Sequence, residues 1–588
     1  MKKEIRDKRL EIKGSLIEEF KIDEEVADKL INDYGIDVID VIIHKPYILC
    51  HYHIELKIVK DIIEKNSLNK NENHKNRDIS AATIIHVIEY LTEIKGDTFI
   101  FVSELKKKIL ELVEVVIKEE LEEALELLET ECEIVRERDK EGRECIYLIR
   151  MYKAEVELAN HITYFVGENR KHTCDSNKIS EFINGYDSAD IKLNKLQKEA
   201  VEMALSNRLS VITGVAGGGK TTAIKAIIGG FKYLNYENIQ LVAFTGKAVQ
   251  RMSSVTGMQG STIHRLLGIG LEDRNKVSGV KADVLIIDEA GTVGLEIFKM
   301  LFECLQNNNS NTKIVIVGDK FQLPSISPGN VLDGLLKSGI IPVVNLIDVV
   351  RQEKHSLIIT TAHKILEGTE ITGKKTGIWF KKNEFEFIET DSEKIKQQVS
   401  KKVDKLLSNG TSIYDIQVIS PIKNGRSGVV ELNREIADRL NSIQEREVYK
   451  FGILDSVILT KNILNVFNGQ KGFIIWVESN LNRLELITVD FGSRVVTFKG
   501  KEIENIELAY VSTVHKMQGS EAKNVIVVID KDHERMLNRE LLYVAVTRGI
   551  ESVTIIGSKE AFNKAVNRVS RERHSLLAER LIGLRIAS

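Results

Sequence analysis

Eight consecutive residues have the types and spacing needed to bind a polyphosphate. Gly214 to Thr221 have the sequence Gly-Val-Ala-Gly-Gly-Gly-Lys-Thr, which fits the pattern G-x-x-x-x-G-K-[ST]. The β-branched run Leu209–Thr213 before them predicts a buried strand, and the residues from Thr222 predict a helix. A strand, a glycine turn and a helix N-terminus together direct backbone N–H groups and a helix dipole at phosphates. The sequence therefore predicts a nucleoside triphosphate site; the alternative is a glycine loop that only turns the chain.

Individual residues of this loop have distinct expected roles. Lys220 is expected to reach the β- and γ-phosphates, and the hydroxyl of Thr221 is expected to hold Mg²⁺. The loop and the first helical turn would contact the phosphates through Gly214, Gly217, Gly219, Lys220, Thr221 and Thr222.

Two acidic residues, Asp288 and Glu289, follow Val284–Ile287, an apolar run that predicts another strand. The carboxyl end of a parallel strand faces the same crevice as the phosphate loop. Asp288 would then hold Mg²⁺ through water, and Glu289 would orient the attacking water as a general base. An ordinary loop entry is the alternative interpretation.

Three further residues are candidates for contact with the γ-phosphate. Gln322 follows the predicted strand Lys313–Val317, although a single loop glutamine is more simply explained by bonding to water. Arg351 and Arg548 lie beyond the first predicted sheet and would have to reach the nucleotide across a domain interface. Such an arginine can accelerate phosphoryl transfer by roughly 10³–10⁵. Taken alone, each arginine is better explained by a surface ion pair.

Composition bounds the class of protein. The chain has 588 residues, 43% hydrophobic and 29% charged, which suits a soluble globular protein of about four domains. No apolar run is long enough to span a bilayer, and the first residues lack the core of a signal peptide. The five cysteines are scattered without zinc-ligand spacing, which favours a reducing cytoplasm. The net charge of −3 gives no global basic field, so any nucleic-acid binding must use a local groove.

The pattern of the chain changes along its length. Residues 1–190 are mostly helical and end with two β-like runs joined by the turn Asp139–Gly142, as in a winged-helix-like unit that binds either nucleic acid or protein. From 191, short apolar strands alternate with helices, which predicts parallel α/β sheets. Close-spaced strands over 440–507 predict a small inserted β-barrel. The locally basic stretch 563–588 predicts a solvated helix face.

The order and spacing of these segments resemble the superfamily 1 helicases. The resemblance is to the RecD-like 5′→3′ group, which includes stand-alone RecD-like helicases and the helicase part of TraA-type relaxases. It covers about 191–560 and rests further on Leu193–Gln197, Thr245–Ala248, Thr262–Leu267, Gly318–Ser325, Arg351-Gln352, Val514–Glu521 and Thr547-Arg548.

The resemblance implies a domain plan and further site residues. It implies RecA-like domains at 191–345 and at 346–439 with 508–588, an SH3-like domain at 440–507, and a duplex-splitting pin hairpin at about 269–280. Gln197 would contact the adenine, while Lys220, Glu289, Gln322, Arg351 and Arg548 would keep the catalytic roles given above. The single-strand channel would be lined by Thr245, Lys247, His264, Thr513, His515 and Lys516.

Departures from the family pattern concern the phosphate loop and the pin. Ala216 and Gly218 stand where the family commonly has proline and threonine, and Gly218 is expected to make the loop more flexible. The pin segment is short and rich in charge, which makes strand separation a weaker expectation than ATP hydrolysis.

The implied function is an ATP- and Mg²⁺-dependent helicase. It would move 5′→3′ on single-stranded DNA and unwind duplexes at single-strand/double-strand junctions, in repair or recombination. Two alternatives remain: an ATP-controlled nucleic-acid-binding switch, and a subunit of a larger recombination or mobilisation complex that docks through its N-terminal domain.

Overall fold

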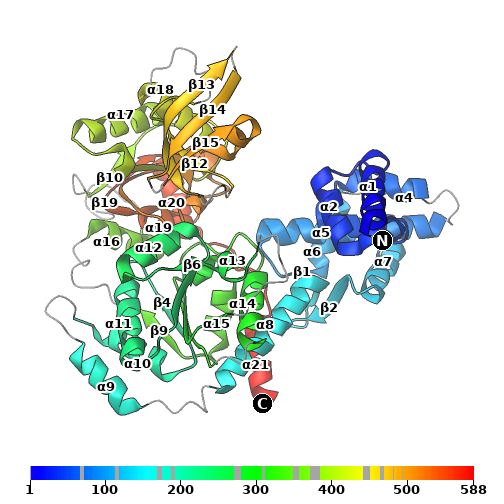
Figure 1. Ribbon diagram of the computed structural model, residues 1–588, viewed down its shortest axis with the longest axis horizontal. Helices are drawn as coiled ribbons and strands as arrows, with labels where there is room; N and C mark the ends of the chain where they lie inside the picture. The colour runs from blue at the N-terminus through cyan, green and yellow to red at the C-terminus, as the bar shows by residue number, and fades with distance from the viewer. Residues whose placement is uncertain are drawn as a thin grey trace.

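The computed structural model describes residues 2–66, 72–112, 118–168, 175–186, 192–269, 280–307, 311–347, 356–370, 384–440, 451–461, 463, 466, 469–480, 483–492 and 494–587. In Figure 1 an N-terminal helical domain lies to one side of two stacked α/β domains, and an antiparallel sheet stands at the far end of the second. Within the described part of the chain, no helix is long and apolar enough to cross a membrane.

The first α/β domain is built on a six-stranded sheet in the order β6-β5-β7-β8-β4-β9, and all its pairings are parallel. Its central strands are rich in valine, isoleucine and leucine because helices cover both faces of the sheet. This confirms the parallel α/β sheet predicted from 191. The strands are β4 (Leu209–Gly214), β5 (Ile239–Ala243), β6 (Ser261–Thr262), β7 (Val284–Asp288), β8 (Lys313–Gly318) and β9 (Val343–Leu346). Around them lie α10 (Lys195–Ser206), α11 (Lys220–Tyr233), α12 (Gly246–Thr256), α13 (Ile263–Leu266), α14 (Leu295–Asn307) and α15 (Val331–Ser338).

The second α/β domain has a five-stranded parallel sheet in the order β10-β19-β18-β11-β17. Two such sheets in one chain are the arrangement expected of paired RecA-like domains. The strands are β10 (Phe385–Glu389), β11 (Ile416–Ser420), β17 (Val511–Thr513), β18 (Ala522–Ile529) and β19 (Gly549–Gly557). The helices are α16 (Leu357–Leu366), α17 (Ile395–Ser408), α18 (Val429–Leu440), α19 (Arg539–Val546) and α20 (Lys559–Asn567).

An antiparallel sheet is inserted between β11 and β17, in the order β15-β14-β13-β12-β16. Its buried side chains include Val457, Ile474, Ile487 and Phe498. Among the described residues no pairing joins β15 to β16, so closure into a barrel stays a prediction. The strands are β12 (Ser456–Leu459), β13 (Lys471–Asn480), β14 (Arg483–Asp490), β15 (Val495–Lys499) and β16 (Ile506–Leu508).

The N-terminal domain combines helices with a small antiparallel sheet in the order β1-β3-β2. The predicted hairpin is present: β2 (Ile134–Arg138) pairs with β3 (Glu144–Leu148), and β1 (Phe99–Phe101) adds to β3. The Asp139 side chain closes the turn by accepting hydrogen bonds from the backbone of Glu141 and Arg143, at 2.9 and 2.8 Å. The helices are α1 (Lys2–Glu18), α2 (Glu24–Tyr34), α3 (Val38–His44), α4 (Leu56–Asn66), α5 (Glu72–Lys95), α6 (Val102–Leu112), α7 (Lys118–Thr130), α8 (Ile149–Glu168) and α9 (Ser176–Gly185).

The C-terminal segment differs from its predicted place in the second RecA-like domain. After α20 the chain crosses to the other two domains, and α21 (Leu577–Ala587) packs against α8 and α15 (Figure 1). Arg571 forms a bidentate pair with Asp97 at 2.6 and 2.7 Å, and Arg580 pairs with Glu137 at 2.6 Å. The expectation of a solvated basic face was therefore wrong for Arg580, whose side chain is 14% exposed, whereas Arg571 is paired but remains 46% exposed. Their partner carboxylates lie in the N-terminal domain, which the local charge pattern does not reveal.

Candidate nucleotide site and interdomain cleft

The phosphate loop has the geometry that its sequence predicts. It joins β4 to α11, and both Gly217 and Gly219 have left-handed backbone conformations, with φ of 76° and 79°. Glycine adopts these angles without steric cost. A β-carbon on Gly218 would lie 2.4 Å from the carbonyl oxygen of Leu346 at the end of β9. Gly218 therefore allows the loop to pack closely on β9, while its effect on the flexibility of the loop stays a prediction.

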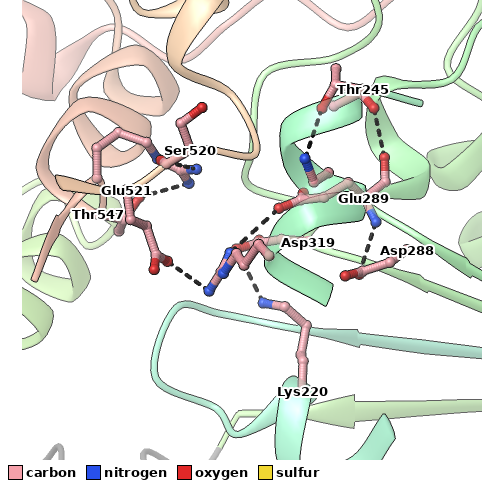
Figure 2. A network of polar contacts seen from close by, with 12 residues as sticks. Lys220, Thr245, Asp288, Glu289, Asp319, Ser520, Glu521 and Thr547 are labelled. Atoms are coloured by element: carbon pink, nitrogen blue, oxygen red, sulfur yellow. Dashed lines mark hydrogen bonds and ion pairs between the residues drawn. The ribbon is translucent and has the colours of Figure 1, made fainter. Parts of the chain in front are cut away.

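Lys220 begins α11 and turns back over the loop. Its Nζ donates hydrogen bonds to the carbonyl oxygens of Gly214 and Val215, at 2.6 and 3.0 Å. The same ammonium lies 3.6 Å from Asp319 Oδ2, at the end of β8 (Figure 2). Thr221 and Thr222 follow in the first helical turn, both partly exposed. Lys220, which is predicted to bind phosphate, thus contacts the carbonyls of its own loop and lies near the carboxylate of Asp319, which directly follows the neighbouring strand.

Gln197 lies directly beneath this loop. Its side-chain amide donates to the Gly219 carbonyl at 3.2 Å, and its side-chain oxygen accepts from the Asn194 backbone at 2.9 Å. Asn194 in turn caps α10 by accepting from the Gln197 backbone at 2.8 Å. The structure therefore ties Gln197 to the phosphate loop through the capping box of α10.

Asp288 and Glu289 stand at the carboxyl end of β7, beside the phosphate loop in the sheet edge that Figure 2 shows. Asp288 Oδ1 accepts a hydrogen bond from the Glu289 backbone at 2.8 Å. Burial, and then the Glu289 charge, raise the pKa of Asp288 to about 6. Glu289 itself has φ of 51°, a conformation that costs a non-glycine residue about 1–3 kcal/mol and is concentrated at functional sites.

These residues fit a magnesium nucleotide. The Thr221 hydroxyl and the Asp288 carboxylate are the oxygen ligands that Mg²⁺ prefers. A bound cation would also offset the repulsion between Asp288 and Glu289. Gln322 Oε1 is buried and has no hydrogen-bond partner among the described residues. An unpartnered polar atom of this kind is costly unless a ligand or water satisfies it.

Of the two arginines that are candidates for contact with the γ-phosphate, only Arg548 lies among the described residues. Arg548 is 3% exposed, and its guanidinium donates to Val544 O at 3.0 Å, Thr547 Oγ1 at 3.3 Å and Ser520 O at 3.4 Å. All three acceptors belong to the second α/β domain, so the structure does not bring Arg548 onto the phosphate loop. Arg351 lies outside the described residues, as do residues 270–279 of the predicted pin.

Sequence reasoning missed Tyr543, which closes the second domain onto the first. Its hydroxyl donates to Asp319 Oδ2 and accepts from the Ala216 backbone N–H, each at 2.7 Å. A proline at position 216 would have no N–H to donate. Gln518 adds a second bridge by donating to the Leu323 carbonyl at 3.0 Å. Tyr543 lies in the segment that also holds Arg548, but both of its partners lie in the other domain, so no local pattern predicts this bridge.

The predicted DNA-contacting residues come from both α/β domains. Thr245 caps α12 by accepting from the Ala248 backbone at 3.2 Å, and His264 packs on the Phe244 ring at 5.1 Å between centroids. In the second domain, Thr513 Oγ1 accepts from the Lys516 backbone at 3.3 Å. Burial lowers the pKa of the His515 imidazole. The structure therefore places the first two residues in the first α/β domain and the others in the second, and their contact with DNA stays a prediction.

Three lysines from different parts of the chain lie near one another: Lys247 from the first α/β domain, Lys516 from the second and Lys471 from the inserted sheet. Burial, and then Lys516, lower the pKa of Lys247 to about 8; burial, and then Lys247, lower that of Lys471 to about 7. Lys471, on β13, was not predicted. A cavity of about 650 Å³ is lined in part by Lys247, Gln417, Lys471 and Gly519. Clustered ammonium groups with lowered pKa values favour an anionic ligand.

The sequence comparisons agree with this geometry. Residues 192–380 match the family described as AAA domain, and residues 508–556 match the UvrD-like helicase C-terminal domain. The chain is 32% identical over 399 residues to the ATP-dependent RecD2 DNA helicase of Deinococcus radiodurans. The chain is therefore similar to the RecD-like helicases. The alignment covers 66% of this RecD-like chain and 52% of the Deinococcus protein, so the chain spans about half the length of that relative.

Other relatives of the RecD-like chain extend the comparison. The RecBCD enzyme subunit RecD of Buchnera aphidicola subsp. Schizaphis graminum is 26% identical over 510 residues, covering 72% of this chain and 81% of that protein. Among solved structures, the Pif1 helicase from Bacteroides in complex with ADP-AlF3 and ssDNA is 19% identical, with a TM-score of 0.38 over 68% of this chain and 97% of that chain.

Proposed function

We propose that this RecD-like chain is an ATP-dependent helicase that moves 5′→3′ on single-stranded DNA and unwinds duplex DNA. The observation that carries the proposal is the hydrogen bonding of Tyr543, from the second α/β domain, to Asp319 and Ala216 beside the phosphate loop. A nucleotide at the loop would thus lie at a domain interface, where its binding and hydrolysis can be coupled to domain movement.

The proposed hydrolysis uses groups at one edge of the first sheet. Lys220 exchanges its two loop carbonyls for phosphate oxygens, and Glu289 orients the attacking water. Gln322, whose buried side-chain oxygen has no hydrogen-bond partner among the described residues, is proposed to contact the γ-phosphate. Thr221 and Asp288 hold Mg²⁺, which when bound supplies positive charge to the β- and γ-phosphates. Arg351 and Arg548 are proposed to add charge after the domains rearrange.

Single-stranded DNA is proposed to cross both α/β domains. Its phosphates would contact Lys247 and Lys516, and these contacts would not depend on the base sequence. Burial, and then the charge of Lys516, lower the pKa of Lys247, which places the two ammonium groups near each other. The remaining proposed contacts are Thr245, His264, Thr513 and His515. The inserted sheet at 440–507 is proposed to be an SH3-like domain that contacts the tracked strand.

The domain assignments are proposed with one change. The N-terminal domain at 1–190, the first RecA-like domain at 191–345 and the second at 346–439 are kept, and the second also includes residues 508 to about 568. The N-terminal domain is proposed as the docking surface for any protein partner. Junction DNA is the proposed substrate, and repair or recombination is the proposed setting.

The test of this function is ATP turnover with and without single-stranded DNA. The wild-type chain should be stimulated by DNA, whereas Lys220→Ala and Glu289→Gln should each remove turnover. Lys220→Ala should also weaken nucleotide binding, while Glu289→Gln should keep it, because only the lysine contacts the phosphates. Turnover that persists in Lys220→Ala would contradict the phosphate-loop assignment. DNA-stimulated turnover without strand displacement would favour the ATP-controlled switch.

A further inference from the structure

One helix links the proposed DNA contacts to the general base. The first turn of α12 holds Thr245 as its N-cap and Lys247, and Arg251 follows one turn later. Residues four apart lie on the same helix face, so Lys247 and Arg251 face the same cleft. The Arg251 side chain is 41% exposed and therefore has room to move.

Arg251 lies between two carboxylates from different domains. Its Nη2 is 2.6 Å from Glu521 Oε1, whereas its Nη1 is 3.9 Å from Glu289 Oε1. Figure 2 shows Glu289 and Glu521 on opposite sides of the cleft, with dashed contacts converging between them. The guanidinium thus forms a close ion pair with the glutamate of the second domain and a longer one with the general base of the first.

The loop that carries Glu521 is pressed onto the start of α12. Gly519 has φ of 70°, and a β-carbon there would lie 3.0 Å from Ala248 Cβ and 3.1 Å from Thr245 Oγ1. This close packing makes the distance between Arg251 and Glu521 depend on how the second domain sits on the first. A ligand that bridges Lys247 and Lys516 would hold the loop in place.

Competition for one guanidinium follows from these distances. A carboxylate oxygen that accepts hydrogen bonds from an arginine has those lone pairs occupied and cannot use them to hold the attacking water. While Glu521 holds Arg251, Glu289 remains available to orient water. If the loop moves away, Arg251 is free to close the remaining distance to Glu289, whose side chain is 12% exposed and forms no other ion pair within the described part of the chain.

We propose that Arg251 is a positioning residue that restrains Glu289 until DNA and domain closure hold Glu521 against it. This inference rests on the proposed function and deepens it, because it assigns DNA stimulation to the exchange of Arg251 between Glu289 and Glu521. DNA bound at the first turn of α12 then acts on hydrolysis through a single side chain.

The test compares ATP turnover, with and without single-stranded DNA, in three variants. Arg251→Ala removes the restraint, so its DNA-free turnover should rise by about tenfold, toward the DNA-stimulated wild-type rate, as expected for loss of one charge-assisted hydrogen bond. Glu521→Gln removes the competitor, so its turnover with DNA should fall toward the DNA-free wild-type rate. The double variant should behave like Arg251→Ala, a non-additive result that marks direct coupling.

Two controls separate positioning from a structural role. Arg251→Lys keeps the charge and should keep part of the stimulation, while the exposed Arg535→Ala should match wild type. The KM for ATP and the affinity for DNA should be unchanged in Arg251→Ala, with the effect confined to kcat. Low turnover in Arg251→Ala under both conditions, or stimulation equal to wild type, would overturn the inference.

The inference and the proposed function fail differently. Wild-type turnover that does not respond to DNA contradicts the proposed function. The restraint of Glu289 by Arg251 is tested without DNA. Turnover in the absence of DNA should rise in Arg251→Ala and should not rise in Glu521→Gln, whether or not the wild-type chain responds to DNA.

Discussion

The hydroxyl of Tyr543 donates a 2.7 Å hydrogen bond to Asp319 Oδ2 across the interface between the two α/β domains. Burial, and then the Asp319 charge, raise the pKa of Tyr543 well above its ordinary value, so the phenol stays protonated as a donor. Asp319 lies 3.6 Å from the ammonium of Lys220. The second domain is thereby connected to the phosphate loop through two side chains.

Removing this hydroxyl should weaken the closed arrangement. In Tyr543→Phe the Asp319 oxygen and the Ala216 N–H lose a buried partner, at a cost of about 1–3 kcal/mol. We expect a lower thermal midpoint and lower kcat for ATP, measured by scanning calorimetry and steady-state turnover. Tyr414→Phe, at a side chain that is 70% exposed, is the control and should match wild type. Unchanged stability and kcat in Tyr543→Phe would show that the bridge does not hold the domains.

Gly218 should not tolerate a side chain. In Gly218→Ala the new β-carbon would meet the Leu346 carbonyl oxygen at 2.4 Å, which forces the loop away from β9. Overpacking of about 1–3 kcal/mol corresponds to roughly tenfold weaker nucleotide binding or more, measured by titration with a fluorescent nucleotide. Gly291→Ala is a matched control near the site, because its β-carbon would meet its nearest neighbour at an ordinary 3.6 Å. Equal affinities in the two variants would refute the close approach.

Asp288 should make stability depend on pH in the free protein. Its pKa is raised from 3.8 to about 6, so between these values the folded protein holds a proton that the unfolded chain releases. Stability therefore falls as the pH rises through this window. Asp288→Asn lacks this penalty and should have the higher thermal midpoint at pH 7.5 and nearly equal midpoints at pH 4. Mg²⁺ with nucleotide should reduce the difference between the thermal midpoints of Asp288→Asn and the wild type at pH 7.5. A difference independent of pH would contradict the assignment.

Glu155 should anchor the C-terminal segment. This fully buried carboxylate accepts from Ser575 Oγ at 2.7 Å and from Arg580 Nε at 3.0 Å, and from Thr98 and Tyr147 of its own domain. Glu155→Gln replaces an acceptor with an amide that faces donors, at a cost of about 3 kcal/mol.

The matched control for Glu155→Gln lies two residues further along the same helix. Glu157→Gln changes a side chain that is 44% exposed and should have little effect. Limited proteolysis near residue 570 should be faster in Glu155→Gln only. Equal cleavage in the two variants would show that the segment is held by its apolar contacts alone.

Local patterns predicted the elements but not the contacts between domains. The strands β4, β7 and β8, the glycine loop and the hairpin β2–β3 follow from runs of a few residues, whose periodicity and turn chemistry are local. Tyr543, Arg251 and Lys471 carry no such signal, because their partners lie in other domains.

Contacts between residues far apart in the sequence also explain what the local patterns did not predict. The need for glycine at position 218 is not evident from the loop sequence, because the Leu346 carbonyl that approaches it lies in another strand. The local charge pattern does not predict the ion pairs of Arg571 and Arg580, because their partners Asp97 and Glu137 lie more than four hundred residues earlier in the chain. The role of Arg548 at the nucleotide stays a prediction, because its hydrogen bonds to Val544 and Ser520 hold it within the second α/β domain.

Strand displacement on tailed duplexes tests the central claim most directly. Two substrates should share one duplex and differ only in carrying a 5′ or a 3′ single-stranded tail, with Glu289→Gln as the inactive control. The account predicts ATP-dependent displacement from the 5′-tailed duplex and none from the 3′-tailed one. Displacement from the 3′-tailed duplex alone, or DNA-stimulated hydrolysis with no displacement from either, would contradict it.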